Sequence, residues 1–106
     1  MRLRFYVTSA GANPVKRYLD GLAGRDAAEV FASFRHIESH GLDGLVSCRS
    51  IKGKVWELRI SQQRIFYVLI TGPEMVLLHA YKKQGQKAPR VEIDLAMRRM
   101  KDVLGA

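Results

Sequence analysis

Two arginines on neighbouring segments have the type and spacing to act on a phosphate. Arg59 lies near the end of one run of β-branched and aromatic residues, 55–60, and Arg64 begins the next, 64–71. The guanidinium suits bidentate contact with phosphate, and several cations over a concave face would stabilise a pentacovalent transition state. The same half of the chain holds more basic residues, at Arg49, Lys52, Lys54, Lys82, Lys83, Lys87 and Arg90. The pattern favours a hypothesis of RNA cleavage, and a solvated surface charge is the alternative for each arginine taken singly.

One carboxylate shares these segments. Alternation along residues 55–60 puts Glu57 and Arg59 on one face of a strand and Trp56 on the other, so that we expect Trp56 in the core. Glu57 could position a hydroxyl or act as a weak base among the cations. A structural ion pair of Glu57 with Arg59 or Lys82 is the alternative that the residues leave open.

The tyrosine and histidine side chains leave more than one interpretation. Tyr81 could stack on a base or orient the phosphate, and it could equally be a core aromatic residue. His36 and His40 lie one helical turn apart, but no Cys or third His completes a metal site, which favours a solvated surface pair. His79 is expected as a hydrogen-bonded core residue that could also face the charged surface. We expect no metal and no cofactor, because the sequence has no zinc spacing, Walker loop or dinucleotide fingerprint.

Composition bounds the class of protein. With 106 residues, 47% of them hydrophobic, the chain can build one compact core, and we expect a single domain over residues 1–106. The chain has 18 Lys and Arg against 10 Asp and Glu, a net charge of +8 that favours a polyanion over a neutral metabolite. Cys48 is the single cysteine, and the sequence shows neither a signal peptide nor a membrane-spanning run. We therefore expect a cytoplasmic protein without membrane contact.

The N-terminal region has a strand pattern followed by a helix start. Leu3, Phe5 and Val7 alternate with more polar positions, which predicts a half-buried first strand. Asn13 and Pro14 are the residue types preferred at a helix cap and first helical position, so a short amphipathic helix should follow.

A second helix and a group of strands are predicted after it. Apolar residues recur at helical spacing from Asp26 until Gly41, which gives a longer helix and, with the first, a helical hairpin. Residues 41–53 hold three glycines and no sustained periodicity, and are predicted to be a mobile loop. Short strand-like runs follow at residues 55–60, 64–71 and 75–82. A last helix is expected from Pro89.

The order β, α, α, β, β, β, α predicts an α+β fold. We expect an antiparallel sheet with an N-terminal helical hairpin and a C-terminal helix. Such a sheet can carry its helices on one face and leave the other open, and the open face is where a functional site would lie.

At this point the residues match a known pattern. The run KVWELRISQQRIFYVLI, followed by LLHAYKKQGQKAPRVEIDLAMRRMKD, resembles the RelE/HigB toxin superfamily, and in particular its HigB-like, phage-derived branch. That branch has a "WELR" strand, an "RIFY"-like strand, and an aromatic-Lys-Lys strand end that leads through "QKAP" to an "EI..A..R" helix. The similarity covers about residues 50 to 104, and the helical hairpin agrees more loosely.

The resemblance implies a toxin of a type II toxin–antitoxin pair with a RelE-like fold. Such an enzyme is an endoribonuclease, or mRNA interferase, that enters the ribosomal A site. There the ribose 2′-hydroxyl attacks the adjacent phosphate, and basic side chains replace a metal. The implied partners are mRNA on the ribosome and a cognate antitoxin, which for the HigB-like branch is usually a helix-turn-helix protein.

The resemblance also carries residue roles and one departure. Arg64 matches the family's strand arginine at the scissile phosphate, Lys82 and Lys83 match its basic strand-end positions, and Lys87 matches less closely. Val55 and Glu57 stand where well-known RelE members have two catalytic lysines, so the general base is unassigned. A non-catalytic homologue that binds RNA or an antitoxin is therefore the alternative reading.

Overall fold

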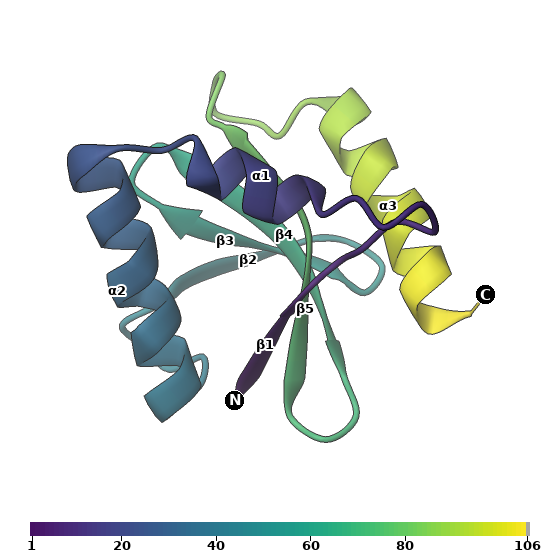
Figure 1. The fold of residues 1–106 in the computed structure, drawn as a ribbon, viewed down its shortest axis with the longest axis horizontal. Helices are drawn as coiled ribbons and strands as arrows, with labels where there is room; N and C mark the ends of the chain where they lie inside the picture. The colour runs from purple at the N-terminus through teal and green to yellow at the C-terminus, as the bar shows by residue number, and fades with distance from the viewer. Residues whose placement is uncertain (106) are drawn as a thin grey trace.

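The fold is described by a computed structural model for residues 1–105, which form a sheet with helices on both of its faces (Figure 1). In chain order the elements are β1 (Arg2–Phe5), α1 (Pro14–Asp20), α2 (Gly24–His40), β2 (Ser47–Lys52), β3 (Val55–Ile60), β4 (Gln63–Ile70), β5 (Glu74–Lys82) and α3 (Arg90–Leu104). The predicted α+β class is confirmed. The observed order is βααββββα, which has one strand more than expected.

The strands form a five-stranded sheet in the order β1-β5-β4-β3-β2. The pairs β2–β3, β3–β4 and β4–β5 are antiparallel, as the short turns between them require, whereas β1 pairs parallel with β5. Glu74 at the start of β5 also forms ion pairs with Arg2 and Arg4 of β1, at 3.4 and 2.9 Å. Strand β2 is the opposite edge of the sheet.

Local sequence signals account for the helix boundaries. The Asn13 side chain accepts a hydrogen bond from the Lys16 backbone N–H at 3.2 Å, and Pro14 occupies the first turn of α1. Helix α2 ends at Gly41, whose φ of 74° is a conformation that glycine adopts without steric cost. The predicted start of α1, stop of α2 and start of the last helix at Pro89 are confirmed.

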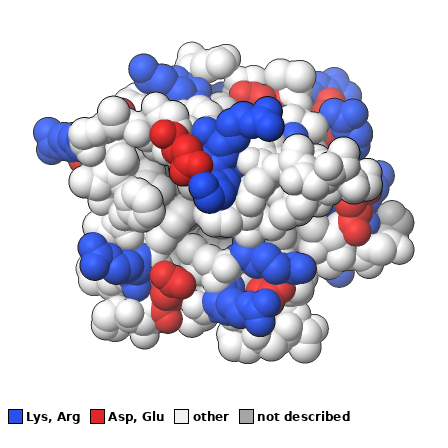
Figure 2. Space-filling view, in the orientation of Figure 1, with Lys and Arg blue, Asp and Glu red and all other residues white. Residues whose placement is uncertain are grey.

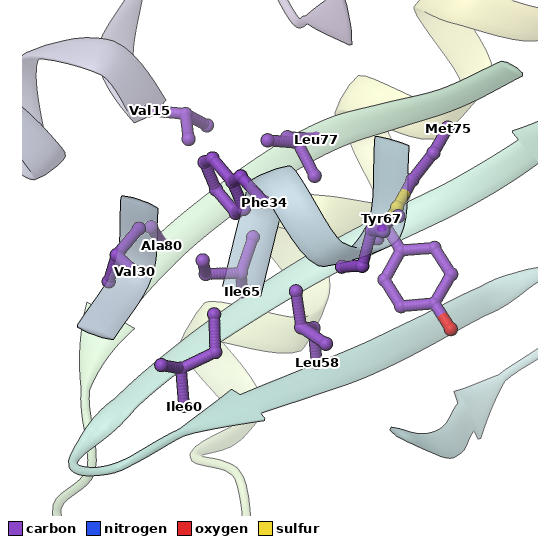
Figure 3. Close-up of a cluster of buried hydrophobic side chains, with 11 residues drawn as sticks. Val15, Val30, Phe34, Leu58, Ile60, Ile65, Tyr67, Met75, Leu77 and Ala80 are labelled. Atoms are coloured by element: carbon purple, nitrogen blue, oxygen red, sulfur yellow. The ribbon is translucent and has the colours of Figure 1, made fainter. Parts of the chain in front are cut away.

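Helices α1 and α2 cover one face of the sheet. Figure 1 shows α1 crossing in front of the strands with α2 beside it. Val15 of α1 and Val30, Phe34 and Ile37 of α2 are buried against strand residues such as Leu58. Figure 3 shows Phe34 between Leu77 and Ile65, with the strand side chains of this cluster beneath α2.

Helix α3 covers part of the other face. Its Ala96 and Met100 pack with Phe66, Val68 and other strand residues in a second buried cluster. The expectation that all helices share one face was therefore wrong, because α3 is itself amphipathic and needs an apolar surface to cover. A site on the open sheet, as the sequence predicts, would then lie on the part of this face that α3 leaves uncovered.

The segment predicted to be a loop contains strand β2. Ser47, Cys48, Arg49 and Ser50 pair with β3, and the register shifts before Lys52. Four of its six residues are exposed, so the strand has no apolar run for sequence periodicity to detect. Its structure comes from hydrogen bonds to β3, and the loop prediction was wrong for this reason.

Two assignments of side chains to the core were also wrong. Val7 is 52% exposed, and Tyr6 is buried because α3 covers the face of the sheet toward which Tyr6 points. The Tyr6 hydroxyl donates to Asp102 of α3 at 2.7 Å. Trp56 alternates with Leu58 as expected but is 41% exposed. Alternation along a strand decides to which face of the sheet a side chain points, and the extent of the helices that cover this face decides whether the side chain is buried.

Candidate functional site

Four strands and one loop bring polar side chains together at a small hollow on the α3 side of the sheet. Arg49 comes from β2, Glu57 from β3, Arg64 from β4 and Tyr81 from β5. The loop after β5 completes the wall with Lys83, Gln84, Gly85, Gln86, Lys87 and Ala88. The hollow therefore combines cations with a carboxylate and a phenol.

Strand register explains this convergence. Arg49 stands directly opposite Glu57, and Arg64 stands directly opposite Tyr81. Glu57 is also opposite Phe66, which belongs to the cluster beneath α3. Because side chains alternate between the faces of a strand, these residues share one face of the sheet.

Glu57 is a buried carboxylate with a cation beside it. Its side chain is 1% exposed, and its Oε1 lies 3.3 Å from Nη2 of Arg49. The alternative of an ion pair with Arg59 or Lys82 gave the wrong partner, since β2 is a strand and places Arg49 opposite Glu57. A buried charge needs such a partner, because removal from water costs several kcal/mol.

Tyr81 lies under the hollow as a packed aromatic residue. Its ring meets Phe66 edge-on at 5.4 Å between centroids and stacks with His79 at 5.8 Å. Burial raises the pKa of Tyr81 to about 12, the negative charge of Glu57 adds to the rise, and Arg64 opposes it. The hydroxyl therefore keeps its proton at neutral pH and can donate a hydrogen bond or a proton.

His79 connects this face of the sheet to α3. Its Nε2 lies 3.0 Å from Glu92 Oε1, and its Nδ1 lies 3.4 Å from Nη1 of Arg99. The tautomer with a proton on Nε2 satisfies both contacts, because that N–H donates to the carboxylate and Nδ1 accepts from the guanidinium. Burial lowers the pKa of His79, Glu92 raises it, and Arg99 lowers it. His79 is thus the hydrogen-bonded core residue that was expected.

Arg64 is held by the turn that precedes it. Its Nη1 donates to the backbone carbonyls of Ser61 at 2.8 Å and Gln63 at 2.9 Å. Ser61 has a φ of 54°, so the tight β3–β4 turn directs its carbonyl toward this guanidinium. Among residues 1–105, no hydrogen bond or ion pair occupies Nε or Nη2, which leaves their three N–H groups for a ligand.

Comparison with known proteins assigns the family and fold. Residues 17–101 match the family of phage derived protein Gp49-like sequences, which is more than half of the chain. The chain belongs to the Gp49-like family. No curated protein matches it. The structure resembles a chain of the archaeal RelE–RelB complex from Pyrococcus horikoshii OT3, with a TM-score of 0.59, 14% identity, and coverage of 82% of this chain and 100% of that chain. The family match agrees with the phage-derived branch that the sequence motifs resemble, and the structural match confirms the expected RelE-like fold.

The hollow of this Gp49-like protein collects about half of the residues proposed from sequence. Glu57, Arg64, Tyr81, Lys83 and Lys87 all line it. The others lie outside it, at Arg59, Lys82, Lys52, Lys54 and Arg90. The hollow is therefore the candidate site, and the outer cations are candidates for contact with more distant parts of a bound strand.

The outer cations have identifiable positions. Arg59 lies opposite Arg64 but lines a different hollow with His36 and Val46. Lys82 ends β5 opposite Gln63 and is exposed. Arg90 begins α3 and is 3.9 Å from Asp94.

Lys52 and Lys54 flank Gly53 in the turn between β2 and β3, and both are exposed. Gly53 has a φ of 54°, a conformation that glycine adopts without steric cost and that this tight turn requires.

Arg49 is the site residue that sequence reasoning missed. It was counted among the basic residues, but the loop prediction for residues 41–53 gave it no face or neighbour. The available signal was its place in a segment with small and polar residues directly before a β-rich run. That signal is weak, because a short edge strand has no periodicity of its own.

The face that carries α1 does not concentrate one sign of charge in this way. Figure 2 shows Lys and Arg on the face that carries α1, where they are dispersed and interrupted by Asp and Glu. Exposed pairs such as Lys16–Asp20 and Arg25–Glu29 contribute to this mixture.

Two further observations complete the description of residues 1–105. His36 and His40 stack at 4.7 Å, and His36 lies 2.9 Å from Asp43, but no group of three His, Cys, Asp or Glu side chains there could hold a metal ion. None of the helices in this range is long and apolar enough to cross a membrane.

Proposed function

We propose that this Gp49-like protein is the toxin of a toxin–antitoxin pair and an endoribonuclease that cleaves mRNA on the ribosome. The observation that carries the proposal is the convergence of Arg49, Arg64, Lys83 and Lys87 on one hollow that also holds Glu57 and Tyr81. Cations around such a hollow suit the phosphate of a single RNA strand.

The proposed reaction uses the RNA's own ribose as the nucleophile. The 2′-hydroxyl gives its proton to the Glu57 carboxylate, and its oxygen bonds to the adjacent phosphorus. The bond between phosphorus and the 5′-oxygen breaks and leaves a 2′,3′-cyclic phosphate. Tyr81 gives its proton to the departing 5′-oxygen. Because Glu57 and Tyr81 line the same hollow, a proton passing from one to the other restores the resting site.

The cations act on the charge that develops at phosphorus. Arg64 has three N–H groups free of partners in the described chain, and they can bind the phosphoryl oxygens as negative charge accumulates there. Lys83 and Lys87 approach from the loop after β5. A preorganised guanidinium contributes most in the transition state, where the charge is largest.

The proposed partners follow from the resemblance and the fold. RelE of Pyrococcus horikoshii OT3 was crystallised in a RelE–RelB complex, and by analogy a cognate antitoxin would hold this protein inactive. A helix-turn-helix protein is the antitoxin type proposed from the HigB-like sequence motifs. The net charge of +8 also favours binding to ribosomal and messenger RNA.

A second candidate is a non-catalytic homologue that binds RNA or an antitoxin. It is favoured by Val55 and Glu57, which replace the two lysines of well-known RelE members, and by the ion pair that occupies Glu57. Both candidates predict RNA binding, and only the first predicts a cut.

The deciding experiment is cleavage of mRNA on programmed ribosomes by the purified protein. We expect cuts in the A-site codon, detected by primer extension, and 2′,3′-cyclic phosphate ends. Arg64→Ala is the inactive control, and a 2′-deoxynucleotide at the cut position should block the reaction. Intact mRNA at full ribosome occupancy would favour the non-catalytic candidate.

A further inference from the structure

Arg49 and Glu57 form an asymmetric pair. The Glu57 side chain is 1% exposed, whereas the Arg49 side chain is 42% exposed and lines the hollow. Both side chains line the hollow, but far more of the Arg49 side chain than of Glu57 is accessible to a ligand that enters it.

The contact between Arg49 and Glu57 is a weak example of an ion pair between a guanidinium and a carboxylate. It joins one nitrogen to one oxygen at 3.3 Å, longer than a typical charge-assisted bond and not bidentate. A phosphate offers the same guanidinium two oxygens in a matching planar arrangement. An incoming phosphate can thus compete with Glu57 for Arg49.

We propose that Arg49 exchanges partners when RNA binds: its guanidinium breaks the contact with the Glu57 carboxylate and binds a phosphate of the strand instead. This inference rests on the proposed function, because it makes Arg49 a residue that contacts the substrate of that same site. The edge position of β2 permits the exchange, since Arg49 has a strand neighbour on one side only.

The exchange has a chemical consequence for Glu57. Once Arg49 has moved to a phosphate, the Glu57 oxygen that it contacted can accept a hydrogen bond from the 2′-hydroxyl of the strand. Glu57 then accepts the 2′-hydroxyl proton once RNA is in place, and the carboxylate becomes a carboxylic acid as the new phosphorus–oxygen bond forms. In the free protein the ion pair keeps the carboxylate occupied.

A purely structural ion pair makes a different prediction. In that case Arg49 would serve only to neutralise the buried Glu57 charge, and RNA affinity would be unaffected by the presence of the carboxylate. The two roles are separated by binding measurements on a double-mutant cycle.

The test uses a short single-stranded RNA with a 2′-O-methyl group at every position, which cannot be cleaved because no free 2′-hydroxyl remains, titrated at low salt into the full chain. Glu57→Gln keeps the shape of the side chain and removes the competitor, so affinity should rise about 10-fold, the size of one charge-assisted hydrogen bond. Arg49→Gln should weaken binding and reduce the log–log salt slope by about 0.7, the value for one phosphate contact. In the double variant the gain from Glu57→Gln should vanish.

Arg25 and Glu29 supply a matched control. They form an Arg–Glu pair on the surface of α2, with 3.0 Å between Nε and Oε1. Arg25→Gln and Glu29→Gln change charge in the same way away from the hollow, so they should show no coupling in RNA binding. Thermal melts of every variant confirm folding. Arg49→Lys, which keeps the charge but cannot bind a phosphate through a planar fork, replaces Arg49→Gln if that variant melts early.

The outcomes separate this inference from the proposed function. If Glu57→Gln fails to tighten binding, or tightens it equally without Arg49, the exchange is overturned even when wild-type protein cleaves mRNA. Absence of any binding to the oligonucleotide overturns it as well. If the coupling is present but programmed ribosomes yield no cut, the exchange stands and the enzymatic proposal fails.

Discussion

Arg64 and Tyr81 stand directly opposite each other on β4 and β5, and the charge of the arginine opposes the burial that keeps the tyrosine protonated. Burial prevails, since the pKa of Tyr81 is raised to about 12. The pair thus presents a cation and a protonated hydroxyl at one hollow, and each can be removed without the other.

Arg64→Ala should abolish cleavage while the protein stays folded. It removes the guanidinium with unoccupied N–H groups beside the proposed scissile phosphate, and loss of one such group typically costs about 10² to 10³ in rate. Single-turnover cleavage on programmed ribosomes measures the effect, with thermal melts to confirm folding. His36→Ala, which loses only the exposed contact with Asp43, is the control and should cost little. Wild-type rates for Arg64→Ala would show that the active face is elsewhere.

Tyr81→Phe should lower the cleavage rate by about 10², because general acid catalysis is lost while the ring contacts with Phe66 and His79 remain. RNA binding should change little. Tyr6→Phe removes a hydroxyl that bonds Asp102 outside the hollow, and its rate should match that of wild type. An undiminished rate for Tyr81→Phe would assign the proton donor to another group.

His79 should make the fold sensitive to acid. Its pKa is lowered in the folded protein, chiefly by burial, so unfolding is accompanied by proton uptake below the ordinary value of about 6.5. Its contribution to stability is therefore present above that pH and is lost as pH falls. His79→Gln can still donate to Glu92 and accept from Arg99, but it does not titrate. Melting temperatures from about pH 8 to about pH 5 should fall less steeply for His79→Gln, and parallel curves would contradict this account.

Salt should weaken RNA binding steeply. Each phosphate neutralised on a single strand adds about 0.7 to the log–log slope, and the hollow with its outer cations offers several contacts. The slope is measured by titrating non-cleavable RNA at a series of salt concentrations. Lys87→Gln should lower the log–log slope by about 0.7. If the affinity for RNA does not depend on salt, the cations do not bind phosphates and serve only the solubility of the protein.

Leu58→Ala should destabilise the fold by about 2 to 5 kcal/mol, because it empties a position between the sheet and the helix pair α1–α2. Leu58 is completely buried, whereas Phe31 of α2 is 65% exposed. Phe31→Ala removes a larger side chain and should nevertheless cost much less. Urea denaturation measures both, and equal losses would mean that Phe31 is covered in solution.

Several features could be predicted from the sequence because local physics decides them. The start of α1 at Pro14 follows from its cap, the end of α2 at Gly41 from glycine's freedom at positive φ, and the strands β3, β4 and β5 from β-branched and aromatic runs. Arg64, Lys83 and Lys87 were picked out by residue type and by resemblance, and they converge on the hollow.

The features that only the tertiary structure decided depend on which segments become neighbours. Strand β2 has no apolar periodicity and forms only because its backbone pairs with β3. The place of Arg49 and its contact with Glu57 therefore could not be foreseen. Alternation gave Trp56 the correct face but could not show that the covering helices leave it 41% exposed. A side chain's type and spacing are properties of the chain, whereas burial and ion pairing are set by the groups that packing places beside it.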